Sequence, residues 1–133
     1  MGVVLGYDLR RKDHDCELLR KMAGEWRQIS PCYYGDYYPL TPYSIDESQW
    51  IAWQFYRPES GDGVVEAFRR SKSEEGIEVL RMNGLDAVVD YEITDLDTNT
   101  PKVLSGKELM EKGLRVEIAK NPGAVTIVYK RAK

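Results

Sequence analysis

The part of the chain from Trp50 onward consists of short segments in which apolar and polar residues alternate, with no long helical segment between them. A period of two residues places side chains on opposite faces of an extended chain, so each segment predicts a β-strand. Turn-forming residues such as Gly61-Asp62-Gly63 and Asn83-Gly84 separate these segments, and Ser105 is expected to cap a single helical turn. The strands are expected at residues 50–56, 64–70, 77–82, 88–94, 102–104, 114–118 and 125–129. This order predicts a mainly β fold, an antiparallel β-sandwich of Greek-key type.

Residues 14–29 have a different period, because apolar residues recur there at intervals of three and four. This pattern predicts one N-terminal α-helix, with Asp13 as its cap and an end before Pro31. Its apolar positions are Leu19, Met22, Ala23, Trp26 and Ile29. A lone helix of this kind needs a partner, so we expect the sandwich to cover its apolar side unless the covering element is missing. Residues 31–48 are rich in Tyr, Pro and Gly and are expected to form an irregular connection.

The composition argues against several classes of partner. The chain has 133 residues, which fits one domain, and 42% of them are apolar, which is typical of an ordered globular fold. Its formal net charge of −3 comes from acidic and basic residues in mixed order, so no strong field favours nucleic acid. No apolar run approaches the ~20 residues that span a bilayer, and residues 1–8 are too short for a signal peptide. We therefore expect a cytoplasmic protein without a nucleic-acid or membrane partner.

Residues that bind metal ions or act as nucleophiles are sparse. Cys16 and Cys32 lack the spacing of a metal site, and His14, the single histidine, has no Cys or His at a ligand spacing. Residues 95–99 alternate oxygen-bearing side chains like a calcium loop, but they lack its glycine and its distal glutamate. We expect two free thiols, no metal ion and no cofactor.

Two clusters of charged residues have structural explanations. Asp8, Asp13, Asp15 and Glu17 could supply a general acid and base, but acidic residues are also favoured at the start of a helix, which explains most of this cluster. The pair Arg69-Arg70 is expected to be a solvated strand end rather than a phosphate site, because no helix follows the nearby glycines to aim N–H groups at an anion.

Three segments of the chain are distinctive: Tyr33-Tyr34-Gly35-Asp36-Tyr37-Tyr38-Pro39-Leu40-Thr41-Pro42-Tyr43-Ser44, Trp50-Ile51-Ala52-Trp53-Gln54-Phe55 and Val65-Glu66-Ala67-Phe68-Arg69-Arg70. They resemble the C-terminal region of bacterial α-galactosidases (melibiases) of glycoside hydrolase family 36. Later segments follow in the same order as in those enzymes: Gly84-Leu85-Asp86, Asp95-Leu96-Asp97, Gly113-Leu114 and Ile127-Val128-Tyr129-Lys130. Leu5-Gly6-Tyr7-Asp8-Leu9 resembles the end of the last strand of their catalytic barrel, and the helix at 14–29 resembles its closing helix.

The resemblance implies a domain organisation and a role. Residues 1–31 would be the end of a catalytic (β/α)₈ barrel, and residues 32–133 would be a C-terminal antiparallel β-sandwich. In this family the nucleophile and the acid/base are two aspartates on earlier barrel strands, which no segment here matches, so no catalytic residue is assigned. The implied role is a non-catalytic accessory domain that braces the barrel of an α-galactosidase-like enzyme and has no activity by itself.

The aromatic residues of this region leave three interpretations open. The candidate residues are Tyr37, Tyr38, Tyr43, Trp50 and Trp53. They could fill a seam between helix, sandwich and barrel. They could instead stack on sugars in a stand-alone carbohydrate-binding module with weak affinity for α-galactosides, which requires Trp50 and Tyr56 to point outward together. As a third interpretation, the barrel-facing surface could be exposed, and the chain would then form homodimers.

Overall fold

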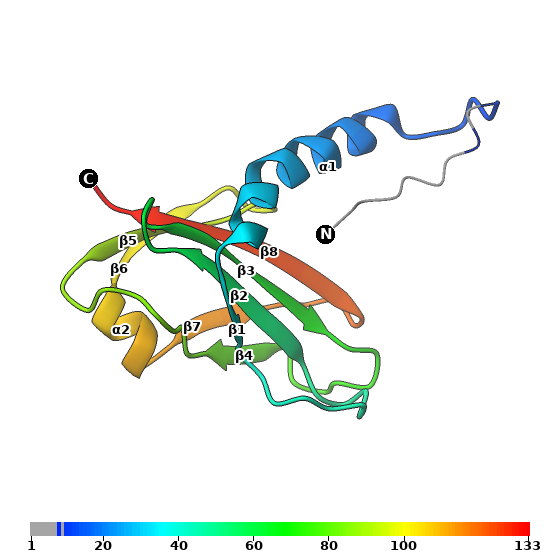
Figure 1. The fold of residues 1–133 in the computed structure, drawn as a ribbon. Helices are drawn as coiled ribbons and strands as arrows, with labels where there is room; N and C mark the ends of the chain where they lie inside the picture. The colour runs from blue at the N-terminus through cyan, green and yellow to red at the C-terminus, as the bar shows by residue number, and fades with distance from the viewer. Residues whose placement is uncertain (1–7, 9) are drawn as a thin grey trace.

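One large sheet organises the molecule, and an α-helix projects from its outer side (Figure 1). The computed structural model describes residue 8 and residues 10–133. The large sheet has six strands in the order β1-β2-β3-β8-β5-β6, and all neighbouring strands in it are antiparallel. These strands are β1 (Asp36–Pro39), β2 (Ile51–Arg57), β3 (Asp62–Arg69), β5 (Asp90–Asp95), β6 (Pro101–Ser105) and β8 (Gly123–Arg131).

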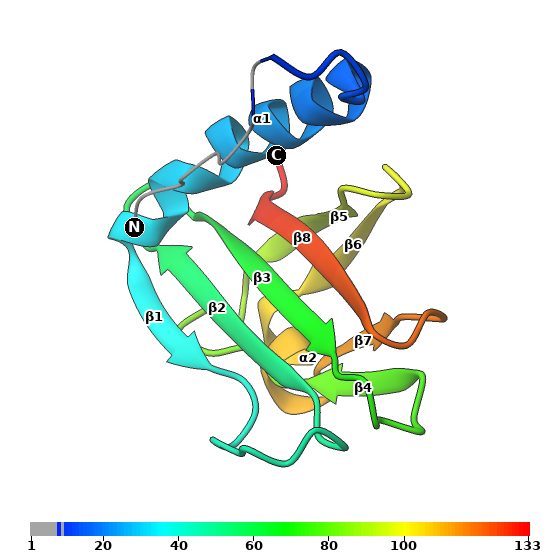
Figure 2. The same ribbon diagram turned by 90° about the vertical axis from the view of Figure 1, so that its right-hand side faces the viewer.

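A smaller layer covers the inner face of this sheet and lies behind it in Figure 2. It consists of the antiparallel pair β4 (Ile77–Leu80) and β7 (Leu114–Glu117), together with α2 (Gly106–Glu111). Ser105 caps α2 as predicted, because its hydroxyl oxygen accepts a hydrogen bond from the backbone N–H of Glu108 at 3.1 Å. The two layers and the N-terminal helix confirm the predicted fold class, a mainly antiparallel β-sandwich.

The core lies between the two layers and follows from the alternation of the strands. In β2, Ala52, Gln54 and Tyr56 are buried, and the residues between them face the outer side of the sheet. The other inward-facing residues of the core include Val65, Ala67, Leu80, Tyr91, Ile93, Leu109, Leu114, Val116, Ile127 and Tyr129. Removing such side chains from water contributes about 1.5–3 kcal/mol each, which explains why the period-two pattern determines the fold.

Gln54 is the one buried amide side chain in this core, among the described residues, and its hydrogen-bonding groups are satisfied. Its Nε2 donates to the carbonyl oxygen of Asn83 at 2.9 Å and to the Tyr129 hydroxyl at 2.8 Å, and its Oε1 accepts from the Asn83 backbone N–H at 2.9 Å. The Tyr129 hydroxyl donates in turn to the carbonyl oxygen of Phe55 at 2.9 Å. These bonds join β2, β8 and the turn after β4, so the polar network fixes the register of the layers.

The N-terminal helix, α1 (Cys16–Ile29), begins two residues later than predicted. Asp15 is its cap, because the Asp15 carboxylate accepts a hydrogen bond from the backbone N–H of Leu18 at 2.9 Å. The assignment of Asp13 as the cap is therefore wrong. At its other end α1 passes into a 3₁₀ helix, η1 (Ser30–Tyr34), which contains Pro31 at its start. The predicted end of the α-helix before Pro31 is confirmed.

Strand β1 lies inside the segment for which the sequence predicts an irregular connection, so that prediction is wrong for residues 36–39. β1 pairs with β2 from Asp36, opposite Tyr56, to Pro39, opposite Trp53. It is an edge strand, and Pro39 stands at its end, where the missing N–H interrupts no ladder. The sequence did not indicate this strand because β1 is short and mostly exposed, and its Tyr and Pro residues show no apolar alternation.

The expectation that Arg69 and Arg70 form a solvated strand end is also wrong. The Arg69 guanidinium donates to the backbone carbonyl oxygens of Ser73 at 3.0 Å and Ile118 at 2.9 Å, and it also reaches those of residues 74 and 119. Arg70 donates to the carbonyl oxygen of Ser44 at 2.7 Å. The two arginines therefore fasten loops to the end of β3, using several donors of one planar group.

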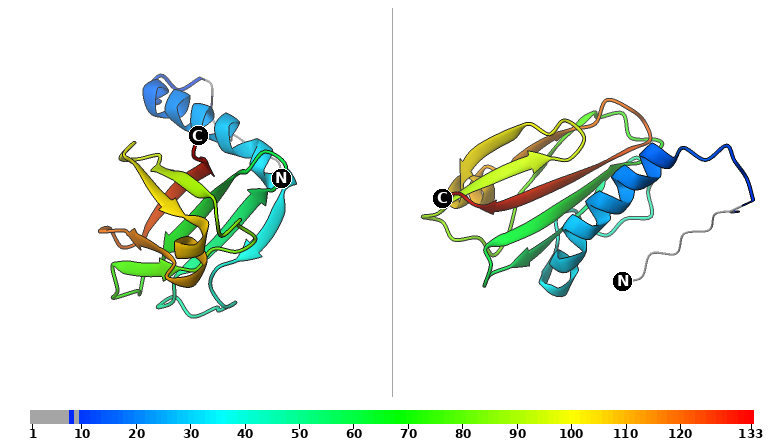
Figure 3. Two further views of the ribbon diagram at one scale, coloured as in Figure 1. Left: turned by 90° about the vertical axis from the view of Figure 1, so that its left-hand side faces the viewer. Right: turned by 90° about the horizontal axis from the view of Figure 1, so that it is seen from above.

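The apolar packing of α1 on the sandwich is confined to its C-terminal end. Figures 1 and 3 show its N-terminal turns lying apart from the strands. Ile29 is the only residue of the helix that is buried. Neither α1 nor any other helix in the described part of the chain is long and apolar enough to cross a membrane.

Candidate interaction surface

A group of aromatic rings lies on the outer face of β1, β2 and β3 and on the adjoining η1. Figure 2 shows that no other layer covers this side of the three strands. We call this group of rings the aromatic face: Tyr33, Tyr37, Trp53, Phe55 and Phe68. The rings contact one another, with centroids 4.9 Å apart for Tyr33 and Phe55, 5.3 Å for Tyr37 and Phe55, and 5.0 Å for Trp53 and Phe68. Tyr37 is 56% exposed, and the other four rings are half-buried. Aromatic rings gathered on an open surface are typical of interaction sites.

Glu66 lies in the middle of this face, on β3, directly opposite Trp53 in the strand register. One of its carboxylate oxygens accepts a hydrogen bond from the Tyr33 hydroxyl at 2.9 Å, and the other accepts from the Trp53 indole N–H at 2.6 Å. Burial, together with this carboxylate, raises the pKa of Tyr33 above its usual range, so the phenol keeps the proton that it donates. Glu66 is therefore an anchored carboxylate surrounded by rings.

A second apolar surface runs along α1. We call Leu18, Met22 and Trp26 the α1 stripe; they are 50%, 54% and 38% exposed. Intervals of four residues place them on the same face of the helix as Ile29, three residues beyond Trp26. Ile29 packs in a small cluster on the outer face of the sheet with Cys32 and Val64. The α1 stripe therefore continues the side of the helix that packs on the sheet.

The polar side of α1 has its own contact with the sandwich. The Lys21 ammonium lies 3.3 Å from the Asp97 carboxylate, in the loop between β5 and β6, and 3.4 Å from Glu25. The helix thus touches the sandwich through a lysine and through its last turn, while most of its apolar side stays open. A self-contained amphipathic helix instead buries its apolar side and exposes its polar side. Of the apolar side of the helix, the sandwich covers only the C-terminal end, and the rest of that side has no cover among the described residues.

A cavity of about 290 Å³ lies between the end of α1 and strands β3, β8 and β5. The charges in its wall are paired, Glu92 with Lys130 at 3.0 Å and Asp62 with Arg57. Burial by itself would raise the pKa of Asp62. Hydrogen bonds from Arg57 and Ser60 lower it by more, so the pKa of Asp62 lies below its usual value. Burial also raises the pKa of the Cys32 thiol in this wall, which disfavours a reactive thiolate. Neither the carboxylate of Asp62 nor the thiol of Cys32 is therefore activated as a base or nucleophile.

The structure separates the five aromatic residues singled out in the sequence. Tyr37 and Trp53 lie on the outer face, and Tyr43 is 93% exposed in the loop after β1. Tyr38 and Trp50 pack on the inner side, where the Trp50 indole N–H donates to the Glu75 carbonyl oxygen at 3.0 Å.

The sugar-stacking alternative requires Trp50 and Tyr56 to point outward, but they are only 4% and 1% exposed, so this pair forms no platform. Sequence reasoning missed Phe68 and Glu66 as parts of the outer surface. The hairpin register could have shown this. Glu66 pairs with Trp53, and Phe68, two residues further along β3, lies on the same face of the sheet.

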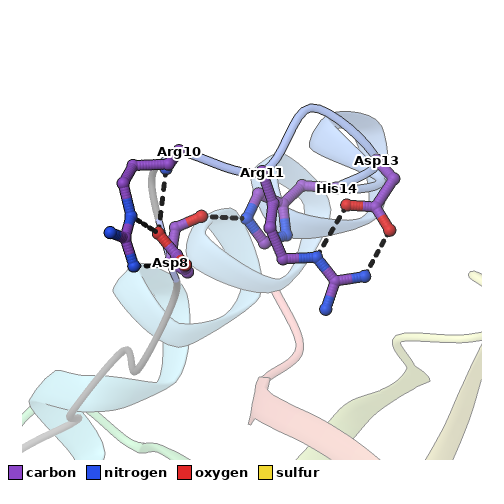
Figure 4. Close-up of polar contacts among 5 residues, drawn as sticks. All are labelled: Asp8, Arg10, Arg11, Asp13 and His14. Carbon is purple, nitrogen blue, oxygen red and sulfur yellow. Dashed lines mark hydrogen bonds and ion pairs between the residues drawn. The ribbon is translucent and has the colours of Figure 1, made fainter.

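The acidic residues near the N-terminus are engaged in local contacts (Figure 4). Asp8 pairs with Arg10 at 2.9 Å, Asp13 pairs with Arg11, and the His14 ring contacts the Asp8 carbonyl oxygen at 2.9 Å. Hydrogen bonds from the arginines lower the pKa of Asp8 and of Asp13, which disfavours a general acid. The barrel-strand resemblance of residues 5–9 lies outside the described residues except for Asp8.

No group of three or more metal-ligating side chains gathers within residue 8 and residues 10–133. In the segment considered as a calcium loop, the Asp95 carboxylate accepts the backbone N–H of Asp97 at 2.8 Å, which is turn chemistry. Cys16 and Cys32 are both free thiols.

The fold and this surface define the class of the protein: an antiparallel β-sandwich domain with a projecting amphipathic helix and an open aromatic face. Residues 50–127 match the family model described as the glycosyl hydrolase family 36 C-terminal domain. The match covers more than half of the chain, and the chain belongs to this family. No curated protein sequence matches the chain.

Solved structures share this fold. The galactosidase domain of the α-galactosidase-sucrose kinase AgaSK superposes with a TM-score of 0.72 at 18% identity, over 92% of this chain and 17% of that one. The family 36 α-galactosidase AgaA of Geobacillus stearothermophilus gives a TM-score of 0.73 at 23% identity, over 91% and 17%. A variant of the same enzyme, solved with raffinose, gives 0.72 at 21%. The chain thus spans about 17% of the length of the structures it matches.

Proposed function

We propose that this chain is the C-terminal accessory domain of an α-galactosidase-like glycoside hydrolase and that it braces the catalytic barrel. The observation that carries the proposal is the α1 stripe, which leaves Leu18, Met22 and Trp26 exposed beside an aromatic face. Apolar surface of this extent on a helix is typical of a site that another domain covers. The family match identifies the chain as a C-terminal domain of this family. The solved relatives are α-galactosidases that are much longer than this chain, so the domain would belong to a larger enzyme.

The bracing role follows from the chemistry of such enzymes. Retaining glycoside hydrolysis requires two carboxyl groups held about 5 Å apart on a rigid frame. In this proposal residues up to 31 form the closing helix of the barrel, and residues 32–133 form the sandwich behind it. The short η1 segment and the Ile29 cluster couple the two rigidly, so a shift of the barrel wall would have to disturb a packed contact. The domain contributes no catalytic residue and works where its catalytic barrel works, in the cytoplasm.

The test is a chimera in which this chain replaces the C-terminal domain of the G. stearothermophilus enzyme. We expect a folded enzyme that hydrolyses p-nitrophenyl α-galactoside, and we expect Met22→Glu to lower its thermal midpoint and its turnover. Arg20→Glu, on the opposite side of α1, is the matched control and should change neither. Equal behaviour of the two variants would contradict the proposal.

The isolated chain provides a second check. In calorimetric titrations with galactose, melibiose and raffinose we expect no heat of binding, and we expect no turnover of the p-nitrophenyl substrate. Binding of a sugar without turnover would instead favour a carbohydrate-binding module. Association of the isolated chain into dimers through the α1 stripe is expected at high concentration, and Met22→Glu should abolish it.

A further inference from the structure

We propose that Glu66 is the receptor for an arginine side chain of the catalytic domain, which would lie against the neighbouring rings of Trp53 and Phe68. The inference rests on the proposed function and deepens it, because it names the chemistry of one contact on the surface that the barrel covers.

Within the described residues, no cation balances the charge of Glu66. Its two oxygens accept hydrogen bonds from neutral donors, the Tyr33 hydroxyl and the Trp53 indole. Among residue 8 and residues 10–133, no ion pair involves Glu66. A half-buried carboxylate whose partners are all neutral keeps an uncompensated charge, so the approach of a cation would be favourable. By contrast, Glu92 on the same face of the sheet forms an ion pair with Lys130 at 3.0 Å.

The Glu66 carboxylate still has room for further hydrogen-bond donors. A carboxylate has about four acceptor positions, and the two donors of this chain use one on each oxygen. Acceptor capacity therefore remains on each oxygen, and a guanidinium group can bind both oxygens of one carboxylate with two parallel N–H groups. The Tyr33 and Trp53 hydrogen bonds hold the carboxylate in place, so little side-chain entropy is lost when a cation binds.

Aromatic rings surround the Glu66 carboxylate. Trp53 and Phe68 stand next to Glu66, with ring centroids 5.0 Å apart and planes at 40°. Guanidinium groups stack on aromatic faces and are weakly hydrated, whereas an ammonium group is more strongly hydrated and makes no bidentate contact. The surroundings of Glu66 therefore favour arginine over lysine.

The test on the isolated chain uses N-ethylguanidinium as the probe and follows the Trp53 indole N–H signal by NMR. We expect a saturable shift of this signal and an affinity about tenfold weaker for Glu66→Gln. Glu92→Gln is the matched control and should bind the probe like the unaltered chain. N-ethylammonium should bind more weakly. No saturable shift, or the same affinity in Glu66→Gln, would overturn the proposal.

The chimera then decides which molecule supplies the arginine. We expect Glu66→Gln to lower the thermal midpoint of the chimera while leaving that of the isolated chain unchanged. An equal midpoint in the chimera, or a dimer of the isolated chain that Glu66→Gln dissolves, would overturn the assignment to the catalytic domain. The probe titration does not involve Met22, so failure of the bracing proposal and failure of this one give different results.

Discussion

The indole N–H of Trp53 donates to the carboxylate of Glu66 at 2.6 Å, across the β2–β3 pair in which the two residues are register partners. This contact turns an otherwise ordinary strand glutamate into a fixed group on an aromatic surface. On the inner side of the sheet, the network around Gln54 ties β2 to β8 and to the turn after β4.

The buried amide of Gln54 yields the first prediction. Gln54→Leu should lower the free energy of unfolding by about 2–3 kcal/mol, because the Tyr129 hydroxyl and both backbone groups of Asn83 lose a partner inside the core. Urea denaturation followed by tryptophan fluorescence measures the change. Gln49→Leu, at an exposed position, is the control and should stay within about 0.5 kcal/mol of the unaltered chain. A stability equal to that control would show that the network contributes nothing.

Two glycines provide a matched pair for the second prediction. A Cβ at Gly106 would lie 2.0 Å from the carbonyl oxygen of Asp86, so Gly106→Ala must displace backbone and should cost more than about 2 kcal/mol. A Cβ at Gly24, in the middle of α1, would meet nothing within 4 Å. Gly24→Ala should therefore stabilise the chain, by up to about 1 kcal/mol, since alanine restricts the unfolded state. Thermal unfolding of both variants checks the opposite signs.

The third prediction separates the packed and open parts of α1. Ile29→Ala should cost about 2–4 kcal/mol in the isolated chain, because Ile29 is only 7% exposed and packs against Val64 and Cys32. Trp26→Ala should cost about 1 kcal/mol or less, despite the larger side chain, because Trp26 is 38% exposed. In the chimera this order should reverse. Chemical denaturation of both variants in both contexts is the measurement, and an unchanged order would contradict the placement of Trp26 at a domain contact.

The fourth prediction concerns high pH. Burial, together with the hydrogen bond to the Tyr91 hydroxyl, raises the pKa of Tyr56 from 10.0 to about 12. Between these values the unfolded state releases the proton and the folded state keeps it, so stability is complete below pH 10 and falls as the pH rises toward 12. Urea midpoints measured at about pH 8 and about pH 11 should show this fall. Tyr56→Phe should show a smaller fall, and an identical one would assign the effect to other groups.

The sequence predicted what depends on local periodicity. Alternation in residues 50–56 located β2 to within one residue, and the three-and-four spacing located the end of α1. It could not reveal β1, because a short exposed strand containing two tyrosines and a proline has no apolar alternation, and only its pairing with β2 makes it a strand. The same limit applies to the candidate surface. Glu66 looks like a solvated strand residue until Tyr33, which is 33 residues away in the sequence, is brought beside it.

The position of β8 imposes an order of events during synthesis. β8 comes after all the other strands in the sequence, yet it lies in the middle of the large sheet, between β3 and β5. Until it emerges from the ribosome, β3 and β5 have no neighbour on their facing edges, and the sheet exists only as two separate pieces. Both open edges can pair with other chains in that interval. The nascent chain should therefore be most prone to aggregation just before β8 emerges.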